Sequence, residues 1–575
     1  MATAPRPAPP DPVPSGLAAF QAGRFEEAEA LFRQAARAAP KSVHAAYFLG
    51  LACAELARFE EADAQISRAI GMGLSDPAAH YHHARALVGL ERSREAEAAL
   101  DRALALKPDF PQALALLGNL HFVRHAHDSA ETLYRKALAL DSSNRLARRN
   151  LAECSFVLGR MDDALEILDS LGRGGGAEAW QDRLAALRLC ERGNRLDEAE
   201  RRAAQLLAVA PTERDLLIVA AKVARRTGRA NEAADFLARA EAAGIDDGQG
   251  GAALTNERAQ LLDSAGRWGE AFAAYAEAKR RQREQQKSGA YDHAGFAARL
   301  DAAEQAVRSP AWPGAAGPAT TPNAGGPIFV LGFFRTGTTL VEQMLSSHSR
   351  IGAAGELTML ERLGDELRPA GRFPEGWAAL DAAAREAIVA PLRAAYLELL
   401  HKRGGEKPRA VDKHPFNVLR LPLIAALFPG APAIRMLRHP LDVILSCYFN
   451  LFEGGNEWSF SLADAARHLA RTHRHVRAVE ARVGVRLLEV RYERLIAEPE
   501  AQLRALLAWL GEEWDPACLE FHRNRRVVET ASYAQVSRPL YSEAVDRWRR
   551  YADLIPREAI EALKPMADEL EYETP

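Results

Sequence analysis

Residues 331–345, LGFFRTGTTLVEQML, have the composition of an anion-binding loop between a strand and a helix. Gly332 and Gly337 keep the spacing of the phosphate-binding motif G-x-x-x-x-G-K-[ST], in which the lysine reaches the terminal phosphates. Thr338 stands where that lysine would be. The sequence therefore predicts a phosphate-like ligand that is held by groups other than the usual lysine.

Several other donors belong to this predicted site. Backbone N–H groups and the positive end of the helix would face an anion. Arg335 adds a forked, charged group that matches phosphate oxygens. Three hydroxyls add further donors: Thr336, Thr338 and Thr339. The simpler alternative is that the glycines form only a tight turn and the threonines cap the helix.

A second pair of residues predicts a second anion site. In RHPLDVILS, Arg438 ends an apolar strand, and Ser446 lies about two turns into the helix that Pro440 begins. Both side chains can therefore face one group near the edge of a sheet. Taken alone, Arg438 is better explained as a surface charge and Ser446 as an ordinary helix residue. Two anion sites on neighbouring strand ends indicate a nucleotide with phosphates on both ends of its ribose.

A sheet must position these residues. Apolar runs of strand length occur in GPIFVLGFF, in PAIRMLR and in RLLEVRY, and helical patterns follow the first two. Strands that alternate with helices predict a parallel sheet whose ligand lies beyond the carboxyl ends of the strands. The predicted fold class of this half is α/β, with a P-loop-like parallel sheet.

The first half of the chain repeats at a fixed period. Alanines recur in segments such as GRFEEAEALF and GRANEAADFL at intervals of 34, 34, 34, 34, 35, 34 and 38 residues. The eight positions are Ala28, Ala62, Ala96, Ala130, Ala164, Ala199, Ala233 and Ala271. Thirty-four residues is the tetratricopeptide period. About eight such units predict an all-α solenoid with a concave groove, which we expect to hold a partner or substrate; the alternative is a structural spacer.

The chain of 575 residues is too long for one core. We predict a proline-rich disordered arm over residues 1–14 and the tetratricopeptide solenoid over 15–285. A helical extension and a linker rich in Pro, Gly and Ala follow over 286–326, and the α/β domain occupies 327–575.

Composition excludes several classes of protein. The net charge of -3 gives no reason to expect nucleic acid as a partner. No stretch reaches the ~18 apolar residues that would span a bilayer, and no secretory signal pattern is present, so we expect a cytoplasmic protein. Five scattered cysteines without C-x-x-C spacing predict neither a disulfide framework nor a metal site: Cys53, Cys154, Cys190, Cys447 and Cys518.

Five motifs in one order resemble a known family. They are GFFRTGTTL, VDKHPF, RHPLDVILS, VRYERLIAEPE and TASYAQVSRPLYSEAVDRWRRY, and the resemblance covers residues 327–555. The set resembles the sulfotransferases that use 3'-phosphoadenosine 5'-phosphosulfate (PAPS). It is most similar to tyrosylprotein sulfotransferases and to bacterial proteins that fuse tetratricopeptide repeats to such a domain. The resemblance implies an enzyme of the EC 2.8.2 type that moves a sulfuryl group from PAPS to an acceptor hydroxyl without a metal.

The resemblance implies how the donor is bound. Arg335, Gly337 and the loop threonines would contact the 5'-phosphosulfate, with Arg335 also stabilising charge on the transferring sulfate. Arg438 and Ser446 would take the 3'-phosphate. The missing lysine of the loop is then expected.

Two further positions match nucleotide contacts, and three depart from the family pattern. Tyr492 and Arg547 occupy the matching positions, although Arg547 replaces a lysine. Tyr533 replaces a serine, and Asn450 stands where the family has an arginine. These departures put nucleotide contacts on that side in doubt.

The resemblance also implies which groups do the chemistry. Glu356, in AAGELTML, matches a glutamate that takes the proton of the acceptor hydroxyl. Lys413, in VDKHPF, matches a lysine that stabilises charge on the leaving phosphate, and Ser532 matches a serine that assists it. His414 replaces an aspartate of the tyrosylprotein pattern and is the rival base, because small-molecule sulfotransferases have a histidine just after such a lysine.

The sequence defines the acceptor less well than the donor. A protein tyrosine, another peptide or protein, a glycan and a small molecule all stay open, with the repeats recruiting the acceptor or a partner. Two rival functions also stay open: a nucleotide-binding scaffold with a silent transferase domain, and a phosphoryl-transferring enzyme, which Thr338 argues against. FEGGNEWSF, residues 452–460, is either a mobile segment over the acceptor or a surface loop.

Overall fold

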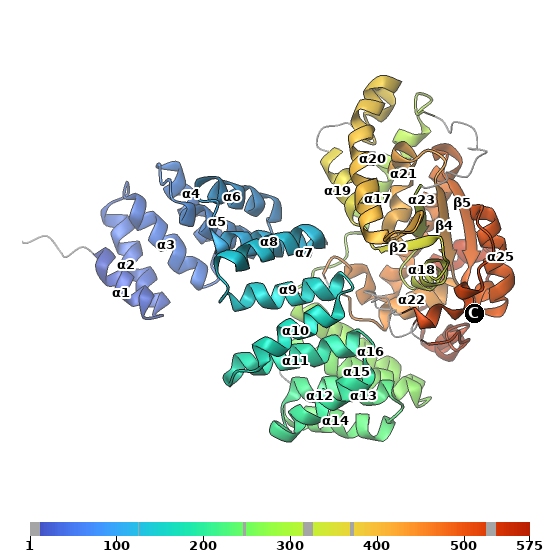
Figure 1. Cartoon of the computed structure of the whole chain (residues 1–575), viewed down its shortest axis with the longest axis horizontal. Coiled ribbons are helices and arrows are strands. Elements are labelled where there is room, and N and C mark those ends of the chain that lie inside the picture. Colours follow the sequence, from blue (N-terminus) through green and yellow to red (C-terminus); the bar gives the residue numbers. More distant parts are fainter. Residues whose placement is uncertain are drawn as a thin grey trace, which may run out of the picture. The chain divides into compact units, whose positions relative to one another are not determined.

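The computed structural model describes residues 12–124, 126–244, 249–313, 326–367, 373–452, 454–524, 536 and 538–575. The chain folds into two compact units, Met1–Asp182 and Arg183–Pro575. The first unit is helical, and the second contains further helices and a parallel sheet (Figure 1).

Successive helices pack in pairs throughout the first unit. The helices are α1 (Pro12–Gln21), α2 (Phe25–Ala38), α3 (Val43–Glu55), α4 (Phe59–Gly71), α5 (Pro77–Gly89), α6 (Ser93–Leu106), α7 (Pro111–Val123), α8 (His127–Leu140), α9 (Arg145–Val157) and α10 (Met161–Gly172), and α11 (Gly176–Arg192) crosses into the second unit. The first helix starts at Pro12, three residues before the predicted start of the solenoid. Proline suits this place because its missing N–H would have no helical partner there.

The repeated alanines lie in the contact between paired helices. Each of the eight is at most 1% exposed. The helices approach so closely that a Cβ added at Gly50 would lie 2.6 Å from the Ile66 side chain, and one at Gly118 would lie 2.7 Å from the Tyr134 ring. One period of about 34 residues is therefore one helix pair, and the predicted helical solenoid is confirmed.

The repeats continue in the second unit up to Gln285, the predicted end of the solenoid. These helices are α12 (Leu196–Val209), α13 (Arg214–Arg226), α14 (Ala230–Ala242), α15 (Gln249–Ser264) and α16 (Trp268–Gln285), and α17 (His293–Arg308) follows as the predicted extension.

The last helix pair shares its core with the α/β part of the chain. Tyr275 of α16 stacks on Phe449 with ring centroids 4.0 Å apart. Ala271 and Ala274 lie in the same hydrophobic cluster as Phe333 of the predicted anion loop. For this reason the compact units divide at residue 182, whereas the sequence predicted a linker over 286–326 between the two domains.

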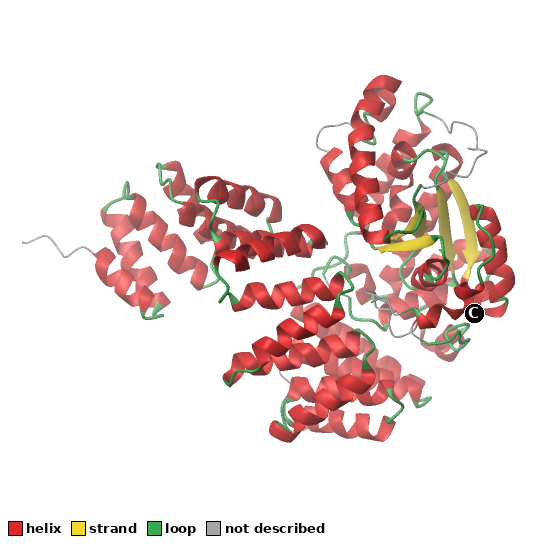
Figure 2. Cartoon of the chain, in the orientation of Figure 1, coloured by secondary structure: helices red, strands yellow, loops and turns green. Residues whose placement is uncertain are grey.

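Five parallel strands form the sheet, in the order β2-β3-β1-β4-β5 (Figure 2). They are β1 (Ile328–Leu331), β2 (Ile351–Gly355), β3 (Arg409–Lys413), β4 (Pro432–Leu437) and β5 (Arg486–Arg491). The sequence predicted β1, β4 and β5. It missed β2 and β3 because IGAAG and RAVDK are short and carry small or charged residues in place of an apolar run.

Helices cover both faces of the central strand. Ile328 and Val330 of β1 pack with α18 and α25, whereas Phe329 and Leu331 pack with α20 and α21 on the opposite face. The helices of this part are α18 (Thr338–Ser346), α19 (Met359–Leu367), α20 (Ala382–Gly404), α21 (Leu421–Leu427), α22 (Pro440–Tyr448), α23 (Leu462–Val483), α24 (Tyr492–Ala497), α25 (Pro499–Leu510) and α27 (Arg557–Glu569). Short 3-10 helices are η1 (Trp377–Ala379), η2 (Pro415–Arg420), η3 (Glu457–Phe460), η4 (Pro516–Arg523) and η5 (Arg547–Leu554).

In the part of the chain that the structure describes, no helix is both long and apolar enough to cross a membrane.

The close helix contacts make a direct prediction for the repeated alanines. Ala96 of α6 is fully buried, so Ala96→Leu should overpack the contact and destabilise the protein by ~1–3 kcal/mol. Ala98, exposed on the same helix, provides the matched control Ala98→Leu. Thermal unfolding should show a clearly lower Tm for Ala96→Leu alone; equal Tm values for the two variants would contradict the packing.

Candidate active site

The predicted site residues lie at one edge of the sheet, because all five strands are parallel. Glu356 directly follows β2, Lys413 is the last residue of β3, Arg438 directly follows β4, and Tyr492 directly follows β5. The loop 332–337 follows β1, which is flanked by β3 and β4. This loop therefore lies between the strand ends that carry Lys413 and Arg438.

The loop after β1 has little room for side chains. Gly337 precedes α18 with a φ of 100°, and a Cβ there would lie 2.7 Å from the ring of Tyr492. The Oγ1 of Thr336 donates to the carbonyl oxygen of Phe333 at 2.7 Å, so this hydroxyl braces the turn of the loop itself. Thr338, the first residue of α18, is buried. These contacts thus hold the backbone of the loop in a tight turn directly before α18.

The structure brings together three residues that the sequence assigned to two anion sites. Arg335 has a φ of 66° and its Nε donates to the Oγ of Ser446 at 2.9 Å. Arg438 Nη1 donates to the backbone carbonyl oxygen of Arg335 at 3.0 Å, and Nη2 donates to that of Ala544. Arg335 therefore lies beside Ser446, and the two predicted sites form one cluster.

This cluster concentrates positive charge at a place where Arg438 is buried and Arg335 is partly buried. Burial, together with the nearby charge of Arg438, lowers the pKa of Arg335 to about 10. Asp442 offsets part of the charge, with Oδ2 3.8 Å from Arg438 Nη2. Burial also raises the pKa of Asp442 to about 6, so this carboxylate is itself held at a cost. An anion bound beside the two guanidinium groups would offset the cost of burying the charge of Arg335.

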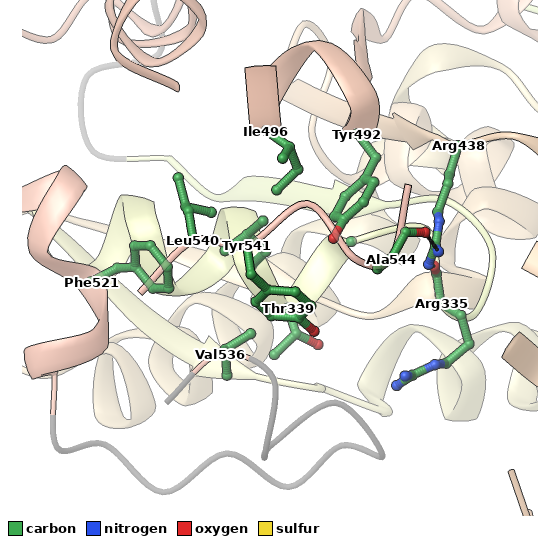
Figure 3. A pocket seen from close by; sticks show the side chains of 12 residues that line it. Arg335, Thr339, Arg438, Tyr492, Ile496, Phe521, Val536, Leu540, Tyr541 and Ala544 are labelled. Atoms are coloured by element: carbon green, nitrogen blue, oxygen red, sulfur yellow. Dashed lines mark hydrogen bonds between the residues drawn. The ribbon is translucent and has the colours of Figure 1, made fainter. Parts of the chain in front are cut away.

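A pocket of about 490 Å³, including the space open to solvent, lies over the loop. Figure 3 shows Arg335 and Arg438 at one end and Phe521 and Leu540 at the other. Between them, the ring centroid of Tyr492 lies 4.8 Å from the Arg438 guanidinium carbon. The remaining lining residues are Gly337, Thr339, Leu340, Ile496, Val536, Tyr541 and Ala544. A charged end and an apolar end suit a ligand that joins phosphates to a flat ring.

Glu356 and Lys413 form an ion pair on the other side of the loop. The Nζ of Lys413 donates to Oε1 of Glu356. Lys413 is buried, whereas the side chain of Glu356 is 35% exposed. The pairing of β2 with β3 shifts by one residue between Ala353 and Gly355, so that Gly355 lies opposite Asp412. This irregularity carries Glu356 to the level of Lys413.

Asp412 is a buried carboxyl group that the sequence analysis did not single out. Its Oδ1 accepts from the N–H of Leu357 at 3.3 Å. Its Oδ2 accepts from the hydroxyl of Tyr396 at 2.5 Å and from Nδ2 of Asn417 at 3.1 Å. Asp412 thus fixes the backbone next to Glu356. The signal was present in VDKHPF, because neighbouring residues of a strand point to opposite faces, and one of two adjacent charges is then buried away from the site.

The other predicted residues are His414, Arg547 and Ser532. His414 is half-buried just after β3, and its backbone N–H donates to the carbonyl oxygen of Val330 at 3.2 Å. Arg547 is not among the residues that line the pocket; its Nη2 donates to Asp263 of α15 at 2.6 Å, and its guanidinium lies 4.9 Å from the ring centroid of Phe449. Ser532 and Tyr533 lie outside the described residues.

Models of two kinds of protein family match separate regions of this chain. Residues 327–516 match the Sulfotransferase family. Residues 14–80, 81–145 and 124–187 match tetratricopeptide repeats. The chain is thus a fusion of tetratricopeptide repeats with a sulfotransferase domain.

Individual relatives share part of this chain. An uncharacterized protein of Aquifex aeolicus is 35% identical over 233 residues, which are 39% of this chain and 30% of that protein. The chain thus spans less than a third of this relative's length. Protein-tyrosine sulfotransferase 1 of Danio rerio is 25% identical over 260 residues, 43% of this chain and 72% of that protein. Among solved structures, Pseudomonas aeruginosa pilF overlaps 36% of this chain and 93% of its own, at 21% identity and a TM-score of 0.31.

Asp412 should make the stability of the protein depend on pH. Burial raises the pKa of Asp412 to about 7, so folding takes up a proton between the ordinary carboxyl pKa of 3.8 and about 7. The stability from this group is complete below the lower value and is lost as pH rises through the upper one, by up to ~1.4 kcal/mol per pH unit. The Tm of the wild type minus that of Asp412→Asn should therefore fall between pH 5 and pH 8.

An exposed carboxyl group provides the control for this experiment. Glu375 is exposed, so the Tm difference between the wild type and Glu375→Gln should stay constant over the same range. A constant difference for Asp412→Asn as well would show that Asp412 is ionised in the folded protein throughout.

Proposed function

We propose that the second unit transfers a sulfuryl group from PAPS to an acceptor hydroxyl. The observation that supports this most is the cluster of Arg335, Ser446 and Arg438 beside a phosphate-binding type of loop without its lysine. One loop would supply backbone donors at a helix start, and the segment after the neighbouring strand β4 would supply Arg438 and, from α22, Ser446. This arrangement suits a nucleotide with anionic groups at two places better than a chain of phosphates on a single side.

The pocket supports the assignment of the donor. Its apolar end would accept the adenine ring, and its charged end would accept the phosphate groups. Arg438 and Ser446 would bind the 3'-phosphate, and the loop from Arg335 to Thr339 would bind the 5'-phosphosulfate. Tyr492 would contact the nucleotide between the two ends. No metal ion is required by this set of donors.

Glu356 and Lys413 are the proposed chemical groups. The carboxylate of Glu356 would take the proton of the acceptor hydroxyl while the acceptor oxygen forms a bond to sulfur. The bond between sulfur and the bridging phosphate oxygen breaks, and Lys413 would stabilise the negative charge on the departing adenosine 3',5'-bisphosphate. In the structure the two side chains form an ion pair in which Glu356 is 35% exposed. Ser532 would assist Lys413.

A protein tyrosine is the acceptor that we propose, since the Danio rerio relative is a protein-tyrosine sulfotransferase. Glu356 is the exposed member of the ion pair, so a large acceptor can approach it from solvent. The repeats would recruit the acceptor protein or a partner along their concave face. We propose that the enzyme acts in the cytoplasm.

Binding of nucleotides tests the proposed donor. The wild type should bind adenosine 3',5'-bisphosphate at least tenfold more tightly than 5'-AMP or ATP in calorimetry with EDTA present. Arg438→Ala should weaken the bisphosphate by roughly ten- to a hundredfold, because one charge-assisted hydrogen bond is worth ~1.5–3 kcal/mol. Arg557, whose side chain is 92% exposed, provides the control Arg557→Ala, which should bind as the wild type does. Failure to prefer the 3'-phosphate would favour the scaffold or phosphoryl-transfer functions instead.

Turnover tests the proposed base. With labelled PAPS and a panel of tyrosine peptides, phenols and oligosaccharides, Glu356→Gln should lower kcat by roughly a hundredfold or more and leave affinity for the bisphosphate unchanged. His414→Ala should retain most of the activity. The reverse result would make His414 the base, and binding of the bisphosphate without labelling of any acceptor would favour a silent scaffold.

A further inference from the structure

A chain of hydrogen bonds leads from the last solenoid helix to the anion loop. The Nζ of Lys279, on α16, donates to the backbone carbonyl oxygen of Asn450 at 2.6 Å. Asn450 Nδ2 donates to the carbonyl oxygen of Ser446 at 2.6 Å. Ser446 Oγ in turn accepts from Nε of Arg335 at 2.9 Å. Two hydrogen bonds, with Asn450 between them, thus connect Lys279 of the tetratricopeptide region to Ser446.

Lys279 is an unusual residue to find at this depth. It is 2% exposed, and its other acceptors are the Oγ of Ser459 at 3.3 Å and the Oε1 of Gln282 at 3.2 Å. The ring centroids of Phe452 and Phe460 each lie 5.7 Å from Nζ. All of these acceptors are neutral, so the ammonium group brings positive charge to the end of α22. Burial lowers the pKa of Lys279 to about 7, which shows that holding the charge here is costly.

The same helix fixes the segment that follows α22. Gln282 Nε2 and Gln286 Nε2 both donate to the carbonyl oxygen of Phe452. Together with the stacking of Tyr275 on Phe449, these contacts fasten both sides of Asn450 to α16. Residues 452–460, for which the sequence left open a mobile segment or a surface loop, therefore begin with Phe452, which Gln282 and Gln286 hold in place.

A simpler explanation is that Lys279 only caps a helix. A cation near the C-terminus of a helix is favourable, and Asn450 lies two residues beyond the end of α22. Such a cap would stabilise the whole fold without preference for one ligand group. Asn450, however, donates to the backbone carbonyl oxygen of Ser446 in particular, and the Oγ of this same residue accepts from Arg335.

We propose that Lys279 is a positioning residue for the 3'-phosphate site, so that the last tetratricopeptide repeat is an integral part of the donor site. Lys279 holds the carbonyl group of Asn450, Asn450 holds the end of α22, and Ser446 is thereby kept in reach of the phosphate and of Arg335. The inference rests on the proposed donor, PAPS, and concerns the side of the site where Asn450 stands in place of the family arginine.

Selective loss of affinity tests this role. Calorimetry with adenosine 3',5'-bisphosphate and with 5'-AMP should be carried out on the full chain as wild type and as Lys279→Met, which keeps the length of the side chain and removes its charge. The bisphosphate should bind roughly five- to tenfold more weakly to Lys279→Met, and 5'-AMP should change less than twofold. Arg280→Met is the matched control, since Arg280 is exposed next to Lys279 on the same helix and pairs with Glu277 and Glu284 of that helix; it should bind both ligands as the wild type does.

Two results would overturn the proposal. Unchanged bisphosphate affinity in Lys279→Met would show that the network does not position Ser446, and a parallel loss for both ligands would make Lys279 a general structural residue. If Lys279→Met does not fold, Asn450→Ala breaks the next link without altering the buried ammonium group, and the same selective loss is expected. A wild type with no preference for the bisphosphate would refute the proposed donor, a result separate from either of these.

Discussion

The hydrogen bond from Arg438 to the carbonyl oxygen of Arg335 is the contact on which the candidate anion site depends. It joins the loop after β1 to the end of the neighbouring strand β4, and the Arg335 side chain completes the connection by binding Ser446. Two guanidinium groups are thereby held close together, at an electrostatic cost that a bound anion would offset. In the proposed donor site, this arrangement would take the place of the missing lysine.

The order of the strands separates the candidate anion-binding residues from the candidate proton-transfer pair. Since β1 lies between β3 and β4, its loop has the arginine cluster on one side and the Glu356–Lys413 pair on the other. A one-residue shift in the pairing of β2 with β3 brings the carboxylate opposite the lysine, and the buried Asp412 fixes the adjoining backbone. A donor that spans the loop would present its transferable group between a cationic site and a base.

The first repeats of the solenoid and its last repeat differ in their relation to the candidate site. Its first repeats form a compact unit of their own, built on alanines that allow close helix contacts. Its last repeat shares a hydrophobic core with α22 and α23 and supplies Lys279 to the end of α22. The boundary between repeat and catalytic parts in the sequence is therefore not a boundary in the structure.

The sequence by itself determined the repeats, since the period of apolar residues carries this information, and local spacing predicted the loop and the proposed anion ligands Arg335, Arg438 and Ser446. It could not determine the strands β2 and β3, because each is short and carries small or charged residues in place of an apolar run. Nor could it show that Arg547 pairs with Asp263, or that Lys279 reaches Asn450 across 171 positions of the chain. Such contacts depend on which elements pack together, and only the tertiary structure decides that, because burial and long-range hydrogen bonding act between segments with no local relation in sequence.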